Sequence, residues 1–118
     1  MKTLVLGASS NPERYSFMAI NRLLQHNHEV VAIGLKNENV LGITIQTGFP
    51  EVNDVHTVTL YLNPLRQVDY YDYIINLNPK RVIFNPGTEN PEFFDLLKKN
   101  NILVEVACTL VLLGTNQY

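Results

Sequence analysis

The sequence "VLGASSNPERYSFMAINRLL", from Val5 to Leu24, joins a strand pattern to a helical pattern. An apolar run ends at Gly7, and small, polar or basic residues follow it. From Ser16 onward the apolar residues recur at a helical spacing, which places them on one face of a helix: Phe17, Ile20, Leu23 and Leu24. The stretch therefore predicts a buried strand over residues 2–6, a turn at the glycine and a helix that begins near Ser16.

The rest of the chain repeats this alternation. Short apolar runs predict further strands over residues 29–33, 42–45, 58–62, 81–84 and 102–106. Between them, Pro64 is expected to open one helix, and Asn90 and Pro91 are expected to cap and open another. A short helix over residues 109–113 closes the chain. Strands that alternate with helices predict a single α/β domain over residues 1–118, a three-layer Rossmann-like fold with a parallel sheet of about five strands and helices on both faces.

Composition excludes several classes of partner. The 118 residues carry a net charge of −2, with 46% hydrophobic and 17% charged residues, so the basic footprint of a nucleic-acid binder is absent. The longest apolar run near the end, "VACTLVLLG", is too short to span a bilayer. The single cysteine, Cys108, cannot form an internal disulfide. We expect a cytoplasmic protein that binds neither nucleic acid nor membranes.

The loop after the first strand has the composition of a phosphate site. Gly7 lacks a Cβ and permits a tight turn, and the start of the next helix offers free N–H groups to an anion. Ser9, Ser10 and Ser16 add hydroxyl donors, and Arg14 adds a guanidinium. The dinucleotide pattern G-x-G-x-x-G is absent, because serine and proline occupy its second and third glycine positions. The alternative is a polar turn before an ordinary capped helix.

The loop after the second strand narrows the choice of ligand. NAD-binding domains place a carboxylate there to accept hydrogen bonds from the ribose. Here the sequence is "IGLK", with Gly34 and Lys36, and the first acid is Glu38. A lysine suits a ribose that carries a phosphate, so NADP and coenzyme A both remain possible and NAD is disfavoured. The alternative is a solvated surface lysine.

The sequence contains no recognisable catalytic constellation. The three histidines flank strand starts and are expected at the surface, and no spacing of histidine, cysteine or carboxylates indicates a metal site. Cys108 precedes a short helix, where a thiolate could be favoured, but a small core thiol is the commoner outcome. We therefore predict no catalytic residue, no metal ligand and no catalytic activity of the chain's own.

The first 36 residues resemble the opening of the small stand-alone CoA-binding domain proteins of bacteria, and the likeness extends over nearly the whole chain. That domain is similar to the N-terminal part of the succinyl-CoA synthetase alpha chain. The matching positions form the first loop: Gly7, Ala8, Ser9, Pro12, Arg14, Tyr15 and Ser16. Two features depart from the family pattern, since Asn63 replaces a frequent arginine and Cys108 alone remains of an acid–arginine–cysteine run.

The resemblance implies binding of coenzyme A or an acyl-CoA, with the first loop at the pyrophosphate and Lys36 at the 3′-phosphate. It assigns no reaction, and ligase activity is not expected without the second, histidine-bearing domain of the synthetase. Asn85 and Gly87 are expected to cover the thiol-bearing arm. The predicted binding residues are Gly7, Ala8, Ser9, Ser10, Arg14, Tyr15, Ser16, Gly34, Lys36, Asn63, Pro64, Asn85 and Gly87. The alternatives are an NADP-dependent oxidoreductase and a nucleotide-fold interaction module without a ligand.

Overall fold

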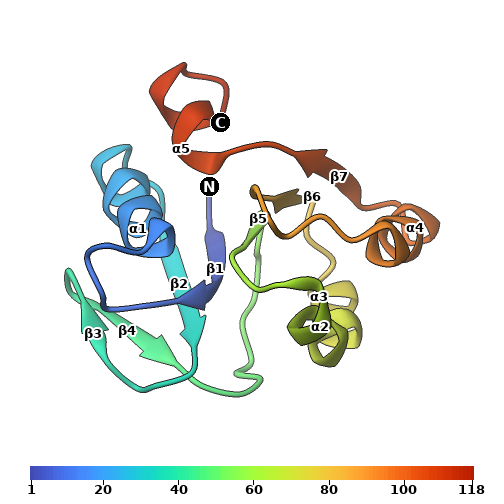
Figure 1. The fold of residues 1–118 in the computed structure, drawn as a ribbon, viewed down its shortest axis with the longest axis horizontal. Helices are drawn as coiled ribbons and strands as arrows, with labels where there is room; N and C mark the ends of the chain where they lie inside the picture. Colours follow the sequence, from blue (N-terminus) through green and yellow to red (C-terminus); the bar gives the residue numbers. More distant parts are fainter.

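A computed structural model describes all residues 1–118 and contains one seven-stranded sheet. The strands are β1 (Thr3–Ala8), β2 (Val30–Gly34), β3 (Asn39–Val40), β4 (Ile43–Gln46), β5 (Thr57–Leu60), β6 (Arg81–Phe84) and β7 (Leu103–Val106). Their order across the sheet is β3-β4-β2-β1-β5-β6-β7, and every pairing is parallel except that of β3 with β4. The predicted α/β Rossmann-like fold is confirmed (Figure 1).

The sheet is larger than the five strands expected, and it is mixed rather than wholly parallel. The strand that none of the predicted apolar runs covers is β3, which spans only two residues and pairs with β4 as a hairpin at the edge of the sheet. Leu41 and Gly42 turn the chain between them, with φ of 53° and 87°. A two-residue strand leaves no periodic pattern in the sequence, so this hairpin could not be seen there.

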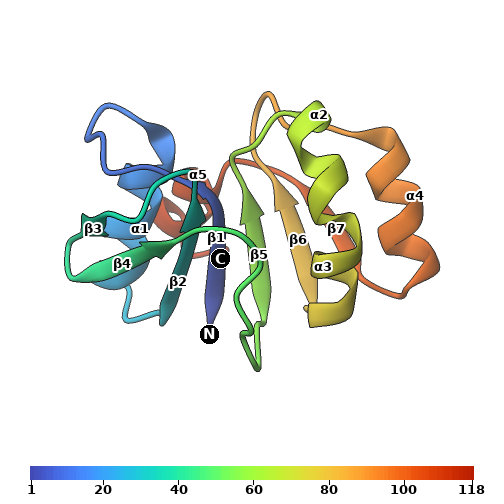
Figure 2. The same ribbon diagram turned by 90° about the horizontal axis from the view of Figure 1, so that it is seen from below.

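Helices cover both faces of the sheet (Figures 1 and 2). They are α1 (Tyr15–Gln25), α2 (Pro64–Gln67), the 3₁₀ helix η1 (Val68–Tyr70), α3 (Tyr71–Leu77), α4 (Pro91–Lys99) and α5 (Thr109–Gly114). α1 and α5 pack on one face, and α2, α3 and α4 lie on the other. None of the helices combines the length and apolarity that a transmembrane span requires.

Asparagine side chains cap two of these helix starts, and the cap at Asn90 confirms the prediction. The side chains of Asn63 and Asn90 accept hydrogen bonds from the backbone amides of Arg66 (3.0 Å) and Phe93 (3.3 Å), each with proline at the next position. The helix expected after Pro64 is not continuous and is divided into α2, η1 and α3.

The helical spacing of Leu65, Val68, Tyr71 and Ile75 predicts that they share one packed face of the helix after Pro64, and this prediction is wrong at the beginning of the helix. Leu65 and Val68 are 87% and 51% exposed. The buried residue of α2 is instead Gln67, whose amide donates to the backbone carbonyls of Leu62 and Thr88 at 2.8 Å each. Its hydrogen bonds satisfy a polar group inside the protein, which apolar periodicity does not anticipate.

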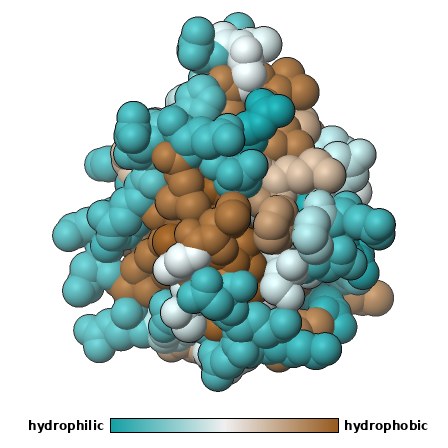
Figure 3. Space-filling view, turned by 90° about the vertical axis from the view of Figure 1, so that its left-hand side faces the viewer, coloured by the Kyte–Doolittle hydropathy of each residue, from teal (hydrophilic) through white to brown (hydrophobic).

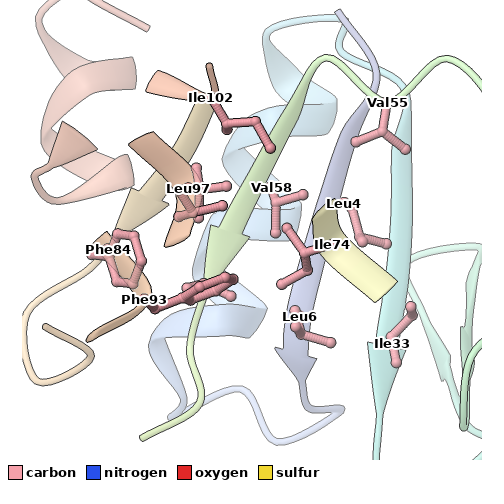
Figure 4. Packing of buried hydrophobic residues seen from close by; sticks show 12 residues of the cluster. Leu4, Leu6, Ile33, Val55, Val58, Ile74, Phe84, Phe93, Leu97 and Ile102 are labelled. Atoms are coloured by element: carbon pink, nitrogen blue, oxygen red, sulfur yellow. The ribbon is translucent and has the colours of Figure 1, made fainter. Parts of the chain in front are cut away.

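The core lies on both faces of the central strands. On the α3–α4 face, Leu4, Leu6 and Val58 pack beneath Ile74 and Phe93 (Figure 4). Phe84 and Phe93 meet edge to face, with ring centroids 5.8 Å apart. A smaller cluster on the other face joins β1 and β2 to α1 and α5. The molecule therefore has two apolar layers that hold the central strands fixed.

The topology gathers four polar loops at one end of the sheet. β1 lies at the centre, with β2 on one side and β5 on the other, so the chain reverses its direction of winding between β1 and β5. Loops that follow these strands meet where ligands of such sheets bind. The side of the molecule that carries α1 and the β3–β4 hairpin is distinct from this end of the sheet. Figure 3 shows apolar side chains gathered on that side and surrounded by hydrophilic ones.

Candidate functional site

A pocket of about 900 Å³ opens at the carboxyl ends of β1, β2 and β5. Its floor consists of strand ends and the residues that follow them, at 6–8, 33–34 and 61–62. One wall is the loop that leads into α1, and the opposite wall is formed by α2 and η1. Residues 86–88 border the third side. The volume lies in the range of small-molecule sites, about 300–1,000 Å³.

The pocket brings together most of the residues predicted from the sequence. Those that line it are Gly7, Ala8, Ser9, Ser10, Arg14, Tyr15, Ser16, Gly34, Lys36, Asn63 and Gly87. Pro64 and Asn85 do not line it. Pro64 is the first residue of α2, beside the capping Asn63.

Asn85 has a supporting position instead. It is 2% exposed, and its amide donates to the Thr59 hydroxyl (2.7 Å) and the Leu60 carbonyl (2.9 Å). Its side-chain oxygen accepts from the Thr109 amide at 2.9 Å. Asn85 thus ties β6 to β5 and to the start of α5, and it fixes the loop that carries the pocket residues 86–88.

The structure adds residues that sequence analysis did not select. The α2–η1 wall contributes Arg66, Asp69 and Tyr70, and the β2–β3 loop contributes Glu38. A signal for the first three was present, since a proline-opened helix after the β5 loop presents residues three and four positions apart on one face. Apolar residues at the strand ends complete the floor, and no polar motif marks them.

The loop between β1 and α1 is organised by its own side chains. The Ser9 hydroxyl accepts from the Asn11 amide (3.1 Å), and the Asn11 side chain accepts from the Glu13 amide (3.0 Å). The backbone amides of Tyr15 and Ser16 have no acceptor within the chain, and no side chain caps α1. The helix therefore begins at the pocket with free N–H groups, the arrangement that favours an anion.

Two glycines allow the strand ends to approach closely at the floor. Gly7 has φ of 95°, and an added Cβ would lie 2.9 Å from the backbone carbonyl carbon of Tyr61. At Gly34 an added Cβ would lie 2.4 Å from the carbonyl oxygen of Ala8. Both contacts are with backbone atoms, which cannot rotate away. A side chain at either position would force the strands that form the floor apart.

Three cations line the pocket without an ion-pair partner: Arg14, Lys36 and Arg66. All three are exposed. Two acids, Glu38 and Asp69, share the lining. Glu38 accepts a hydrogen bond from the Ser10 hydroxyl at 2.9 Å. The walls therefore carry a net positive charge in a chain whose net charge is −2, which favours an anionic ligand.

Tyr61 is the tyrosine of the pocket floor. Its hydroxyl is buried and has no hydrogen-bond partner. Burial raises the pKa of Tyr61 to about 12, although the nearby hydroxyls of Thr109 and Thr59 lower it in part. Those two hydroxyls bond to each other at 2.8 Å. Tyr61 is therefore neutral at physiological pH and contributes an aromatic surface.

No histidine or cysteine lines the pocket. His28 and His56 precede β2 and β5, at the opposite end of the sheet, and burial is the main cause that lowers the pKa of each. His26 is exposed, whereas His28 and His56 are half-buried, so the expected surface position holds fully for His26 alone. No group of three histidine, cysteine or carboxylate side chains is arranged to hold a metal ion.

Solved structures of several proteins resemble this one. An uncharacterized protein is 48% identical, with a TM-score of 0.97 over 99% of this chain and 97% of the other. A hypothetical protein from Pyrococcus horikoshii OT3 is 26% identical, with a TM-score of 0.83 over 92% and 78% of the two chains. A protein from Thermus thermophilus, 21% identical, shares the fold with a TM-score of 0.86 over 99% and 90%.

The comparisons also identify the family. No curated protein matches the chain. The sequence model of a family described as a CoA binding domain matches residues 1–114, which is nearly the whole length. The suspected resemblance is thereby confirmed, and the chain belongs to the CoA binding domain family.

Proposed function

We propose that this protein binds coenzyme A, or an acyl-CoA, in the pocket at the carboxyl ends of β1, β2 and β5. The observation that carries the proposal is that two cations of the pocket lining have no ion-pair partner: Arg14 at the start of α1 and Lys36 after β2. A ligand with phosphates at two separate positions satisfies both. Family membership supports the same ligand class.

The ligand has one arrangement that uses these groups together. The pyrophosphate lies at the free amides of Tyr15 and Ser16, within reach of Arg14. The 3′-phosphate lies beside Lys36. The pantetheine arm then crosses the floor at Tyr61 toward Asn63 and residues 86–88, which border the pocket away from β2.

We assign no reaction to the pocket. Its ionisable groups are the three cations, the two acids and tyrosines, and the chain's histidines and its cysteine lie outside the lining. A nucleophile paired with a base is the usual arrangement for covalent acyl transfer. The lining holds no cysteine or histidine to form the cysteine–histidine or serine–histidine version of that pair, so we propose binding or carriage of the ligand as its role.

The direct test is calorimetric titration with coenzyme A, acetyl-CoA, dephospho-CoA, NADP and NAD. We expect coenzyme A and its thioester to bind most tightly. At 100 times its dissociation constant, a ligand of the folded state should also add about 2.7 kcal/mol to the free energy of unfolding. NADP as the tightest ligand would favour the oxidoreductase alternative, and no binding at all would favour an interaction module.

Arg14→Ala tests the phosphate assignment. Loss of a charged hydrogen bond should weaken coenzyme A binding by about 1.5 kcal/mol or more, roughly tenfold. Arg22→Ala is the matched control, because Arg22 lies in the last turn of the same helix and outside the pocket. Equal affinities of both variants, with the fold intact by circular dichroism, would contradict the assignment.

A further inference from the structure

One side-chain hydrogen bond joins two separate loops that line the pocket. The Ser10 hydroxyl, in the loop before α1, donates to the carboxylate of Glu38, in the loop after β2, at 2.9 Å. Both residues line the pocket. The other side-chain hydrogen bonds of the first loop, those of Ser9 and Asn11, stay within that loop. Ser10 is thus the serine of this loop whose hydroxyl is bonded to a charged group of another loop.

The bond has a chemical consequence for the first loop. A serine hydroxyl has a single proton to donate, and Ser10 donates it to Glu38. A ligand phosphate is also a pure acceptor, so it cannot receive that proton while Glu38 holds it. A phosphate bound at Ser10 must displace the carboxylate and must also overcome its like charge.

The backbone at Glu38 is fixed, which limits how the carboxylate can leave. The Glu38 carbonyl accepts a hydrogen bond from the Ile45 amide at 2.7 Å, and Asn39 pairs with Thr44 in the hairpin that follows. Displacement therefore occurs by rotation of the Glu38 side chain alone. That side chain is exposed, so water can solvate the carboxylate once it has moved.

We propose that Glu38 is a specificity-determining residue that occupies the place of a ligand phosphate and opposes the binding of the 3′-phosphate. The inference rests on the proposed function. The phosphate concerned is the 3′-phosphate because Glu38 lies two residues after Lys36 in the same loop. Lys36 attracts that phosphate and Glu38 repels it, so the preference for coenzyme A over dephospho-CoA is the difference between the two effects.

The test is calorimetric titration of coenzyme A and dephospho-CoA into three proteins: the wild type, Glu38→Gln and Asp69→Asn. Glu38→Gln keeps an acceptor for Ser10 and removes the charge. Asp69→Asn makes the same change of charge in the same pocket, at a carboxylate that has no hydrogen bond to the first loop. Glu38→Gln should tighten coenzyme A binding about two- to fivefold, the scale of one exposed charge interaction.

The two nucleotides and the two variants separate the outcomes. For Glu38→Gln we expect a change below about twofold with dephospho-CoA, and for Asp69→Asn a similar effect on both ligands. Weaker binding of coenzyme A to Glu38→Gln would overturn the inference, because Glu38 would then be an acceptor for the ligand. So would equal gains in Glu38→Gln and Asp69→Asn, which indicate a general effect of charge.

If the wild type binds neither nucleotide, the proposed function itself fails and the inference falls with it. If the wild type binds and Glu38→Gln brings no selective gain, the inference alone fails.

Discussion

The two ends of the sheet use charged side chains in opposite ways. At the amino-terminal end, Lys2 pairs with Glu29 at 3.5 Å, and Arg81, the first residue of β6, pairs with Glu105 at 3.0 Å. These are the only ion pairs of the molecule. At the carboxyl-terminal end, the three cations that line the pocket have no such partner.

The interactions of Arg81 show what pairing achieves at the amino-terminal end. Arg81 is 8% exposed, donates to the Thr57 hydroxyl at 2.9 Å and to the Tyr118 carbonyl at 3.2 Å, and lies 4.4 Å from the centre of the Tyr118 ring. The Tyr118 hydroxyl bonds to that of Thr3. One guanidinium thus joins β5, β6, β7 and the C-terminal segment. Paired charges stabilise the amino-terminal end of the sheet. The cations at the carboxyl-terminal end have no ion-pair partner and are available to bind a ligand.

Arg81→Ala should have the largest effect on stability. It removes one partner of a largely buried pair and leaves Glu105 and the Thr57 hydroxyl without their donor. We expect the free energy of unfolding to fall by about 3 kcal/mol, measured by urea denaturation. Lys80→Ala is the control, because Lys80 is the exposed neighbour and has no side-chain partner. Loss of ligand affinity in a folded Arg81→Ala protein would show that the two ends are not independent.

Gly34→Ala probes the opposite end through its backbone. The new Cβ would lie 2.4 Å from the carbonyl oxygen of Ala8, so the ends of β1 and β2 must separate. We expect a loss of about 2 kcal/mol in the free energy of unfolding, within the range for overpacking, together with weaker ligand binding. Gly114→Ala provides the comparison, since an added Cβ there meets nothing within 4 Å. Equal melting temperatures for the two variants would contradict the close approach at the pocket floor.

Tyr61, on the pocket floor, predicts that the stability of the fold depends on alkaline pH. Its pKa is raised to about 12, mainly by burial, against about 10 in the unfolded chain. Above pH 10 the unfolded state releases this proton and the folded state retains it, so stability falls as the pH rises. The contribution lost between pH 9 and pH 11 should be about 1.3 kcal/mol. Urea denaturation at both pH values should show a shallower loss in Tyr61→Phe, and identical slopes would contradict the burial of the hydroxyl.

The fold could be read from the sequence because its main elements have strong local signals. The apolar run of β1, the periodic face of α1 and the capping Asn90 all appear where they were expected. The elements that were missed depend on tertiary contacts. Gln67 faces inward because the carbonyls of Leu62, just before α2, and of Thr88, in the distant β6–α4 loop, accept its amide protons. The contact with Thr88 leaves no pattern within "LNPLRQ".

The residues of the pocket also divide into those with a local signal in the sequence and those that depend on tertiary contacts. Residues on the first loop were predicted because the glycine turn, the hydroxyls and the start of α1 are contiguous in the sequence. Arg66, in α2, and Glu38, in the β2–β3 loop, are far apart in the sequence, and the order of the strands brings them to the same pocket. Asn85 illustrates the reverse error. A polar residue at a strand end was expected to face the ligand, but its amide and carbonyl satisfy buried partners instead.

Lys36 should give the smallest effect, and it tests whether the unpaired charges of the pocket end act on the ligand. Lys36→Glu should remove the preference for coenzyme A over dephospho-CoA. The change should be only about 0.2–1 kcal/mol, because Lys36 is exposed and water screens its charge. The preference should also shrink as ionic strength rises from low salt to about 1 M, where the Debye length falls to about 3 Å. Titration of both nucleotides at two salt concentrations measures this. A preference that survives in Lys36→Glu, or that is insensitive to salt, would mean that the 3′-phosphate is held elsewhere and that Lys36 is an ordinary solvated side chain.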